Sequence, residues 1–198
     1  MNVNSDDDKK PEPTKRIRRT PEEARSLILQ TAANRLATMG MDGLNISGVA
    51  KAAGMSHGTV IHHFGSTEAM RQALLRYMTE NLLADVVSAL KQDVPHADVM
   101  RRLFDTLSQD GHGRLVAWLS LENQMMRLPP TETSRSLFAD IIATISEKEA
   151  DGARQQVLLV ASAALGFSLC GDVLANLVGM SDDESAEFPA WLAARLQN

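Results

Sequence analysis

The stretch from Leu44 to Phe64, LNISGVAKAAGMSHGTVIHHF, decides the fold of this chain. Its pattern predicts two short helices joined by a tight turn at Gly54-Met55. Asn45 is a favourable N-cap for the first helix, which should run through Ala53, because its side-chain oxygen can accept a free backbone N–H. Gly54 tolerates the positive φ that ends many helices. Two short helices around such a turn are typical of a helix-turn-helix.

The second of these helices should begin after Ser56 and end near His63. Val60 and Phe64 lie four residues apart, so they can form its buried stripe. The outer face then carries no acidic group and consists of His57, Gly58, Thr59, Ile61, His62 and His63. A short helix with polar groups on its outer face fits the major groove of DNA. The pattern therefore predicts a helix that reads DNA.

Individual side chains of this segment suit particular parts of a duplex. His57 can offer a ring nitrogen to a base edge, and Ile61 can contact a thymine methyl group. Thr59 and His63 can form hydrogen bonds with phosphate oxygens. Asn45, at the N-terminus of a helix, can do the same. The segment thus supplies both base-reading and phosphate-binding candidates.

Two other interpretations of the His-rich helix stay open. The segment can be an ordinary hairpin in a helical core, although three histidines in seven residues are unusual there. A metal site is the second alternative. His57 and His62 lie five residues apart, and His62 and His63 are adjacent, so these rings point in different directions. No Cys or acidic residue lies nearby, and we therefore expect no metal.

The rest of the chain also has a helical pattern. Thr20-Pro21-Glu22-Glu23 predicts a capping box at the start of a helix that Gly40 ends. A long helix should follow over 66–92 and act as a stiff connector. Further helices are expected over 97–108, 113–127, 131–150 and 153–180, and from Ser181 to residue 196. We expect an all-α fold in three parts: a disordered basic arm (1–19), a three-helix helix-turn-helix domain (20–65), and a helical domain (66–198) joined to it by the long fourth helix.

Charge narrows the class of protein further. Residues 9–79 carry eleven Lys or Arg against five Asp or Glu, whereas residues 80–198 carry nine against seventeen. A basic first part on an acidic body indicates that the first part binds a polyanion, although ordinary enzymes show such differences by chance. No nucleophile elbow, phosphate loop or metal-ligand spacing is present, so we expect neither an enzyme nor a cofactor.

Cysteine usage and hydropathy favour a cytoplasmic protein. The single cysteine, Cys170, cannot form an internal disulfide, and its apolar neighbours suggest a buried side chain. The polar N-terminus lacks the apolar core of a signal peptide. The closest candidate for a membrane span, Val157 to Leu169, is too short and is interrupted by serine, so we expect no membrane partner.

Residues 20–75 resemble the DNA-binding domain of the TetR (tetracycline-repressor-like) transcriptional regulators. The resemblance rests on the segment NISGVAKAAGMSHGTVIHHFGSTEAM, on the helix before it and on the long helix after it. The residues that carry it are Gly43, Val49, Ala50, Ala53, Gly54, Ser56, Gly58, Thr59, Val60, His63, Phe64, Ser66, Glu68 and Ala69. After residue 75 only the length and the helical rhythm are similar to the family.

The resemblance implies a ligand-responsive repressor that acts as a homodimer on a palindromic operator in double-stranded DNA. Each subunit would place its third helix in the major groove of one half-site. An unknown small-molecule effector would bind the C-terminal domain. By position, the base-reading candidates are Ser47, His57, Gly58 and Ile61, and the phosphate-contact candidates are Asn45, Thr59, His62 and His63.

The chain departs from the family pattern at three positions. Ile61 stands where Tyr is usual, and Thr67 stands where Lys is usual, which removes a hydroxyl and a charge from each half-site. The basic arm, with Arg18 and Arg19, can compensate by binding the minor groove or phosphates. Gly48 should weaken its helix by up to about 1 kcal/mol relative to Ala. An adaptor of the same fold that no longer binds DNA is the alternative function.

The C-terminal half offers candidates for a dimer interface and a ligand pocket. Apolar residues recur at spacings of three and four at Leu158, Ala161, Leu165, Leu169, Val173 and Leu177, which favours a helix of a four-helix dimer interface, or else an internal core helix. Met and aromatic side chains suit apolar ligands and also plain cores. The pocket candidates are Met100, Phe104, Trp118, Met125 and Phe138.

Overall fold

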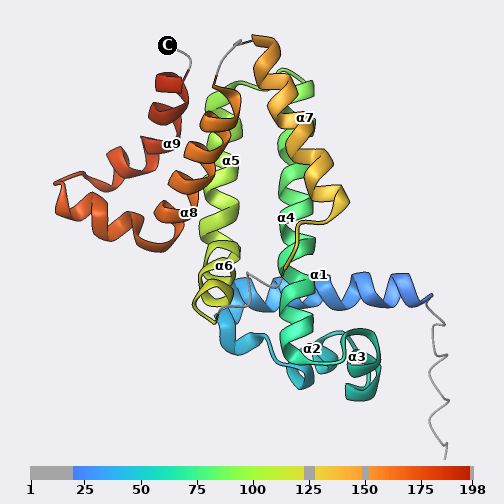
Figure 1. Ribbon diagram of the computed structural model, residues 1–198. Helices are drawn as coiled ribbons and strands as arrows, with labels where there is room; N and C mark the ends of the chain where they lie inside the picture. The colour runs from blue at the N-terminus through green and yellow to red at the C-terminus, as the bar shows by residue number, and fades with distance from the viewer. Residues whose placement is uncertain (1–19, 123–127, 149–151, 197–198) are drawn as a thin grey trace, which may run out of the picture.

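The computed structural model describes residues 20–122, 128–148 and 152–196 (Figure 1). Within these ranges the regular elements are all helical, which confirms the predicted all-α fold. In chain order they are α1 (Pro21–Met39), η1 (Gly40–Gly43), α2 (Ile46–Ala52), α3 (His57–Phe64), α4 (Thr67–Lys91), α5 (His96–Gln109), α6 (His112–Leu121), α7 (Glu132–Lys148), α8 (Ala153–Leu177) and α9 (Asp182–Leu196). The predicted helix over 113–127 ends earlier, at Leu121, and residues 123–127 lie outside the described ranges.

Local sequence signals set the ends of the first helix. The Thr20 side chain accepts the Glu23 N–H at 3.2 Å, and the Glu23 carboxylate accepts the Thr20 N–H at 2.8 Å. This reciprocal pair is the predicted capping box. Gly40 ends the helix with φ at 64° and donates its N–H to the Leu36 carbonyl.

The N-terminal helices pack around the lower part of α4. In Figure 1, α1 crosses α4, while α2 and α3 lie on the far side of α1 from the helical body. The largest buried cluster draws on α1, α2, α3 and α4 and also on α6, with Ile28, Leu36, Val49, Val60, Leu74, Leu115 and Leu119 among its members. The core of the helix-turn-helix end therefore continues into α6, well beyond the domain boundary that the sequence suggested at residue 65.

The helical body has two smaller cores on either side of α4 and α5. Helix α4 packs against α7, where Leu83, Val87 and Ile141 are buried together. Helix α5 packs against α8 and α9 around Phe104 and Leu107. The three rings of Phe104, Phe167 and Phe188 lie with centroids 5.4 to 6.0 Å apart. These contacts make α4 the element shared by both ends of the molecule.

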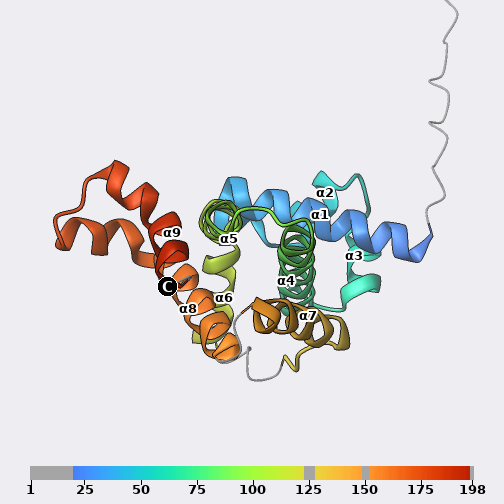
Figure 2. The same ribbon diagram turned by 90° about the horizontal axis from the view of Figure 1, so that it is seen from above.

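Helix α8 bends at Cys170, whose φ of −143° and ψ of 15° are not helical. Beyond the bend, the second half of α8 and the first half of α9 project away from the body as a helical hairpin (Figures 1 and 2). We call residues 171–186 the arm. The helix predicted over 153–180 is present as α8, which ends at Leu177 and bends in its interior. The prediction of a buried Cys170 was wrong, because its side chain is exposed at the bend.

Helix α8 is also long and strongly apolar. It is long and apolar enough to cross a membrane by length and composition, with a mean hydropathy of 2.0 in its best window, contrary to the sequence-based expectation. The apolar stretch is longer than the segment from Val157 to Leu169, because the helix continues to Leu177. Only 11% of that window is buried within the chain. The apolar side chains of α8 are therefore mostly available to another surface.

Candidate nucleic-acid interface

The helix-turn-helix is built by two N-caps and a glycine turn. The Asn45 side-chain oxygen accepts the Gly48 N–H at 2.7 Å, and its amide group donates to the Asp42 carbonyl at 3.0 Å. Ser56 caps α3 by accepting the Thr59 N–H at 3.1 Å. Both caps follow the prediction. Because both polar groups of the Asn45 side chain already have partners, the geometry does not favour its predicted phosphate contact.

Helix α3 buries one stripe and exposes the opposite face. Val60 is fully buried and Phe64 is 8% exposed, as their spacing predicted. The opposite face is open to solvent at His57, Gly58, Ile61 and His62, whereas Thr59 and His63 are half-buried. The structure thus brings the predicted base-reading residues of α3 together on one accessible surface. Among the described residues, an added Cβ at Gly58 would meet only the Ser56 hydroxyl, at 3.8 Å.

A hydrogen bond joins the two helices of the motif. The Ser47 hydroxyl and the His57 Nδ1 are 3.1 Å apart, so α2 holds the first ring of α3 in place. The Nε2 atom of His57 is left for an outside partner, as donor or acceptor according to the tautomer. The Thr59 hydroxyl lies 2.8 Å from the Ser56 hydroxyl and is partly committed to that contact.

The electrostatics of this end suit a polyanion. No Asp or Glu occurs between Gly43 and Thr67, and Lys51 is exposed on α2. Arg25 of α1 donates to the His63 carbonyl at 3.1 Å, and its guanidinium lies 4.5 Å from the Phe64 ring centroid. These contacts fasten the C-terminal end of α3 to α1. Sequence reasoning missed Arg25, because no short-range spacing connects it to residues 38 positions away.

A second arginine connects the motif to the body. Arg71 of α4 donates to the Leu44 carbonyl at 3.1 Å, and its guanidinium stacks over the Trp118 ring of α6 at 4.5 Å. Trp118, predicted as a pocket residue, therefore packs against this arginine at the junction between α4 and α6. The contact joins the start of the helix-turn-helix to the regulatory body.

Packing explains the glycine that looked unfavourable inside α2. A Cβ at Gly48 would come within 2.5 Å of the Arg35 guanidinium. Arg35 in turn donates to the Gly43 carbonyl at 2.8 Å, which holds η1 against α1. Glycine at position 48 is less favourable for the helix than alanine, but it leaves room for Arg35, which a larger side chain would displace.

Three of the predicted site residues lie outside the described ranges, and the adjacent histidines of α3 do not form a metal site with other described residues. Arg18, Arg19 and Met125 lie outside the described residues. The adjacent rings of His62 and His63 are inclined at 71° with centroids 5.8 Å apart. Among the described residues there is no group of three or more His, Cys, Asp or Glu side chains that could hold a metal ion.

The predicted dimer-interface residues divide between the body and the arm. Leu158, Leu169, Val173 and Leu177 are 68%, 49%, 61% and 77% exposed, whereas Ala161 and Leu165 are half-buried. Leu165 packs on the core around Phe104. The sequence did not point to Leu159, Leu174, Val178 and Trp191, which are also large, apolar and more than half exposed. Exposed apolar side chains thus occur along both α8 and α9.

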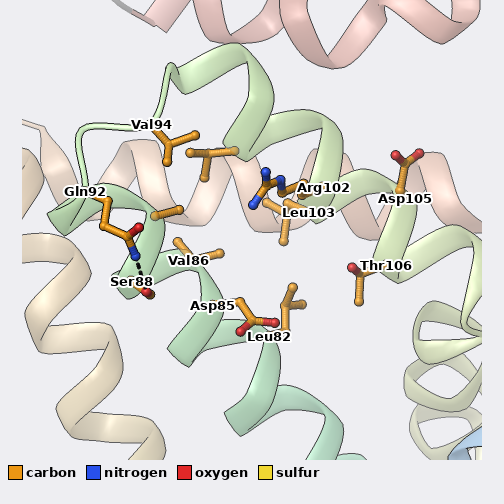
Figure 3. A pocket seen from close by; sticks show the side chains of 12 residues that line it. Leu82, Asp85, Val86, Ser88, Gln92, Val94, Arg102, Leu103, Asp105 and Thr106 are labelled. Atoms are coloured by element: carbon orange, nitrogen blue, oxygen red, sulfur yellow. Dashed lines mark hydrogen bonds between the residues drawn. The ribbon is translucent and has the colours of Figure 1, made fainter.

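The structure has two adjoining hollows beside α4. The α4–α5 hollow has a volume of about 460 Å³, and the α1–α4 hollow, where α1 meets α4 and the start of α6, has about 310 Å³. They share Leu82, Asp85 and Thr106. Figure 3 shows the first hollow, with Arg102 of α5 and Asp85 of α4 on opposite walls.

The predicted pocket residues do not surround either hollow. Met100 and Phe104 lie in the core shared by α5, α8 and α9, and Phe138 is 37% exposed on α7. None of these three residues, nor Trp118, lines a hollow described above. Their role in ligand binding stays a prediction, and the space near α4 is lined instead by more polar side chains.

The N-terminal part of the chain is similar to known regulatory proteins. Residues 28–74 match the family model described as bacterial regulatory proteins, tetR family. The HTH-type transcriptional regulatory protein RaaS of Mycobacterium tuberculosis is 40% identical over 53 residues, which are 27% of this chain. The match spans only 25% of the length of RaaS.

Solved structures extend the likeness to almost the whole chain. The fatty acid degradation regulator FadR from Bacillus halodurans superposes with a TM-score of 0.61 at 16% identity, over 91% of this chain and 97% of that one. The TetR family repressor AlkX from a Dietzia species gives 0.54 at 17% identity, over 87% and 95%. The multidrug binding protein EbrR, complexed with imidazole, gives 0.53 at 20% identity, over 86% and 94%. These identities show a shared fold.

The fold and the exposed α3 define a helix-turn-helix protein with a helical C-terminal body. Its N-terminal domain matches the tetR family model over residues 28–74, and the chain shares its fold with solved TetR-family proteins.

Proposed function

We propose that this protein is a sequence-specific DNA-binding transcriptional regulator. The observation that carries the proposal is the exposed outer face of α3, which Ser47 and Arg25 hold in place and which lies in a segment without Asp or Glu between Gly43 and Thr67. His57, Gly58 and Ile61 would read base edges, and His62 and His63 would contact phosphates. The likeness of the N-terminal domain to RaaS supports this assignment.

The protein acts, in this proposal, as a cytoplasmic homodimer on a palindromic operator. The exposed apolar residues of α8 and α9 support a second copy as partner, because burying them against an equivalent surface would give the isologous contact of a two-fold dimer. A dimer bound at a promoter blocks polymerase, so repression is the expected effect. Two hollows beside α4 and the imidazole complex of EbrR support a response to a small molecule.

The test is binding to DNA from upstream of the protein's own gene, measured by fluorescence anisotropy over a range of salt concentrations. We expect saturable binding that weakens steeply as the salt concentration rises. Unrelated DNA should displace the operator only poorly. His57→Ala should lower affinity for the operator more than for unrelated DNA, because base contacts carry the specificity. Binding with no sequence preference under any condition would contradict the proposal.

Arg18 and Arg19 provide a separate test of the basic arm. Replacing both with Ala should weaken operator binding and reduce the slope of log affinity against log salt by about 2, since each phosphate contact contributes about 0.9. Arg135→Ala, which removes an exposed arginine of α7, is the matched control and should leave the slope unchanged. An unchanged slope in the double variant would show that Arg18 and Arg19 make no phosphate contact.

An adaptor without DNA binding is the second candidate. It is favoured by Ile61, which offers no hydroxyl, and by Asn45 and Thr59, whose polar groups already have partners in the motif. A homodimer that binds a small molecule but shifts no DNA even at low salt would identify this function.

A further inference from the structure

The α1–α4 hollow differs from its neighbour in charge. The α4–α5 hollow has the two carboxylates of Asp85 and Asp105 together with the Arg102 guanidinium in its lining. In Figure 3, Arg102 extends into that space, while Asp105 points away from it. The α1–α4 hollow is lined by the carboxylates of Asp85 and Asp110 and by no Lys or Arg. Within the described part of the chain, neither Asp85 nor Asp110 forms an ion pair.

A buried histidine of the same hollow lacks a hydrogen-bond partner. His112, which lines the hollow at the start of α6, is only 3% exposed. Its Nε2 lies 3.1 Å from the Thr79 hydroxyl, whereas its Nδ1 is buried with no partner in the structure. Burial lowers the pKa of His112 to about 4, so the ring is neutral near pH 7. If Nε2–H donates to Thr79, Nδ1 is an acceptor that lacks a donor.

The remaining walls are mainly apolar or neutral. Ala33 and Ala37 of α1 face the hollow from one side, and Met78 and the Tyr77 ring of α4 face it from the other. A volume of about 310 Å³ is at the lower end of the range for small-molecule sites. Asp85 and Asp110 are exposed and have no ion-pair partner among the described residues. Two such carboxylates beside apolar carbon suit an occupant with several N–H donors, a positive charge and a carbon body.

We infer that the α1–α4 hollow binds a small organic cation, an amine or amidinium whose N–H groups donate to Asp85 and Asp110 and whose carbon body lies against Met78. An organic cation fits better than a metal ion, because the described residues hold no metal-ligating group of three acidic, His or Cys side chains. The occupant would contact α1 of the DNA-binding end and α4 and α6 of the body at once. That it acts as the effector rests on the proposed function; that it binds does not.

Calorimetric titration of the full-length protein tests the binding. Benzamidine and 1,4-diaminobutane are the cationic probes, and benzamide and 1,4-butanediol are their neutral counterparts. We expect at least one cation to bind, its neutral counterpart to bind about tenfold more weakly or not at all, and Asp85→Asn and Asp110→Asn each to weaken the cation about tenfold. Glu147→Gln removes an exposed carboxylate of α7 and should leave the affinity unchanged.

Three results would overturn the inference: no binding of either cation, equal binding of a cation and its neutral counterpart, or equal losses in Glu147→Gln and the two Asp variants. The ¹⁵N resonances of the His112 ring give a measurement on the unmodified protein. They should shift on addition of the bound cation, and an unperturbed ring would count against the site. A protein that binds the cation but no DNA would contradict the proposed function and leave this inference standing.

Discussion

The two ends of this molecule differ in how their apolar side chains are covered. At the DNA-binding end, α1, α2, α3, α4 and α6 bury their large apolar residues in one cluster within the same chain. In the arm, Val173, Leu174, Leu177 and Val178 are all more than half exposed. The first end can be stable in a monomer, whereas the arm needs another surface to bury its leucines and valines. If the arm is the proposed dimer interface, folding and self-association should be separable in this protein.

The largest expected effect tests the self-contained end. Leu36, 1% exposed, lies against Gly111, where an added Cβ would come within 2.9 Å of the Leu36 side chain. Leu36→Ala should lower the free energy of unfolding by about 2–5 kcal/mol, because it leaves a cavity in a tightly packed junction. Chemical denaturation of dilute protein measures the change. Leu174→Ala in the arm is the control and should cost less than about 1 kcal/mol. Equal losses would remove the difference between the two ends.

The next effect tests the arm. Val173→Glu combined with Leu177→Glu should weaken self-association at least about 100-fold, since both charges would be buried in the dimer. The monomer should unfold at nearly the wild-type denaturant concentration, because neither side chain contributes to a core. Analytical ultracentrifugation measures the association. Leu121→Glu, at an 83% exposed leucine of α6, is the matched control and should remain dimeric. A double variant that dimerises normally would show that the arm is not the interface.

A pH titration sharpens the comparison at the junction of the two ends. His112 has a folded pKa of about 4, below its ordinary value of 6.5, because of burial. The unfolded chain therefore takes up a proton on His112 between pH 6.5 and 4 that the folded chain excludes. The contribution of His112 to the free energy of unfolding is therefore fully present above pH 6.5. It decreases as the pH falls from 6.5 to 4, by up to about 3 kcal/mol. Denaturation at several pH values should show a shallower acid loss for His112→Leu. The same slope in both proteins would contradict this assignment.

The smallest stability effect is expected on the exposed face of α3. Gly58→Ala should leave the fold intact and raise the unfolding free energy by up to about 1 kcal/mol, because Ala is the better helix former and space is free. Operator affinity should nevertheless fall, since the methyl group would stand between the helix and a base pair. Fluorescence anisotropy measures the operator affinity, and chemical denaturation of the same preparation measures the unfolding free energy. Gain in stability without loss of affinity would show that Gly58 does not approach DNA.

Sequence reasoning was most successful where structure is set by neighbouring residues. The capping box at Thr20 and Glu23, the caps at Asn45 and Ser56, and the stripe of Val60 and Phe64 all follow from short spacings. Such signals act over one or two helical turns, so they can be recognised before the fold is known. The start of α4 after Ser66 was predicted for the same reason.

Contacts between distant segments could not be foreseen in this way. Arg25 and Arg71 bond to carbonyl groups 38 and 27 positions away, and Gly48 makes sense only beside Arg35. The bend at Cys170 reversed the expectation that this thiol is buried. The pocket candidates were chosen by residue type, but the hollows are lined by side chains that α1, α4, α5 and α6 bring together.

The sequence by itself determined the helical pattern, the helix caps, the acid-free α3 and the match of residues 28–74 to the tetR family model, because each depends on spacings within a short segment. Only the tertiary structure decided that α6 completes the core of the DNA-binding end, that the arm leaves the body, and that His112 and two carboxylates share one hollow. These depend on the packing of helices far apart in the chain, where burial and hydrogen bonding are set by neighbours in space.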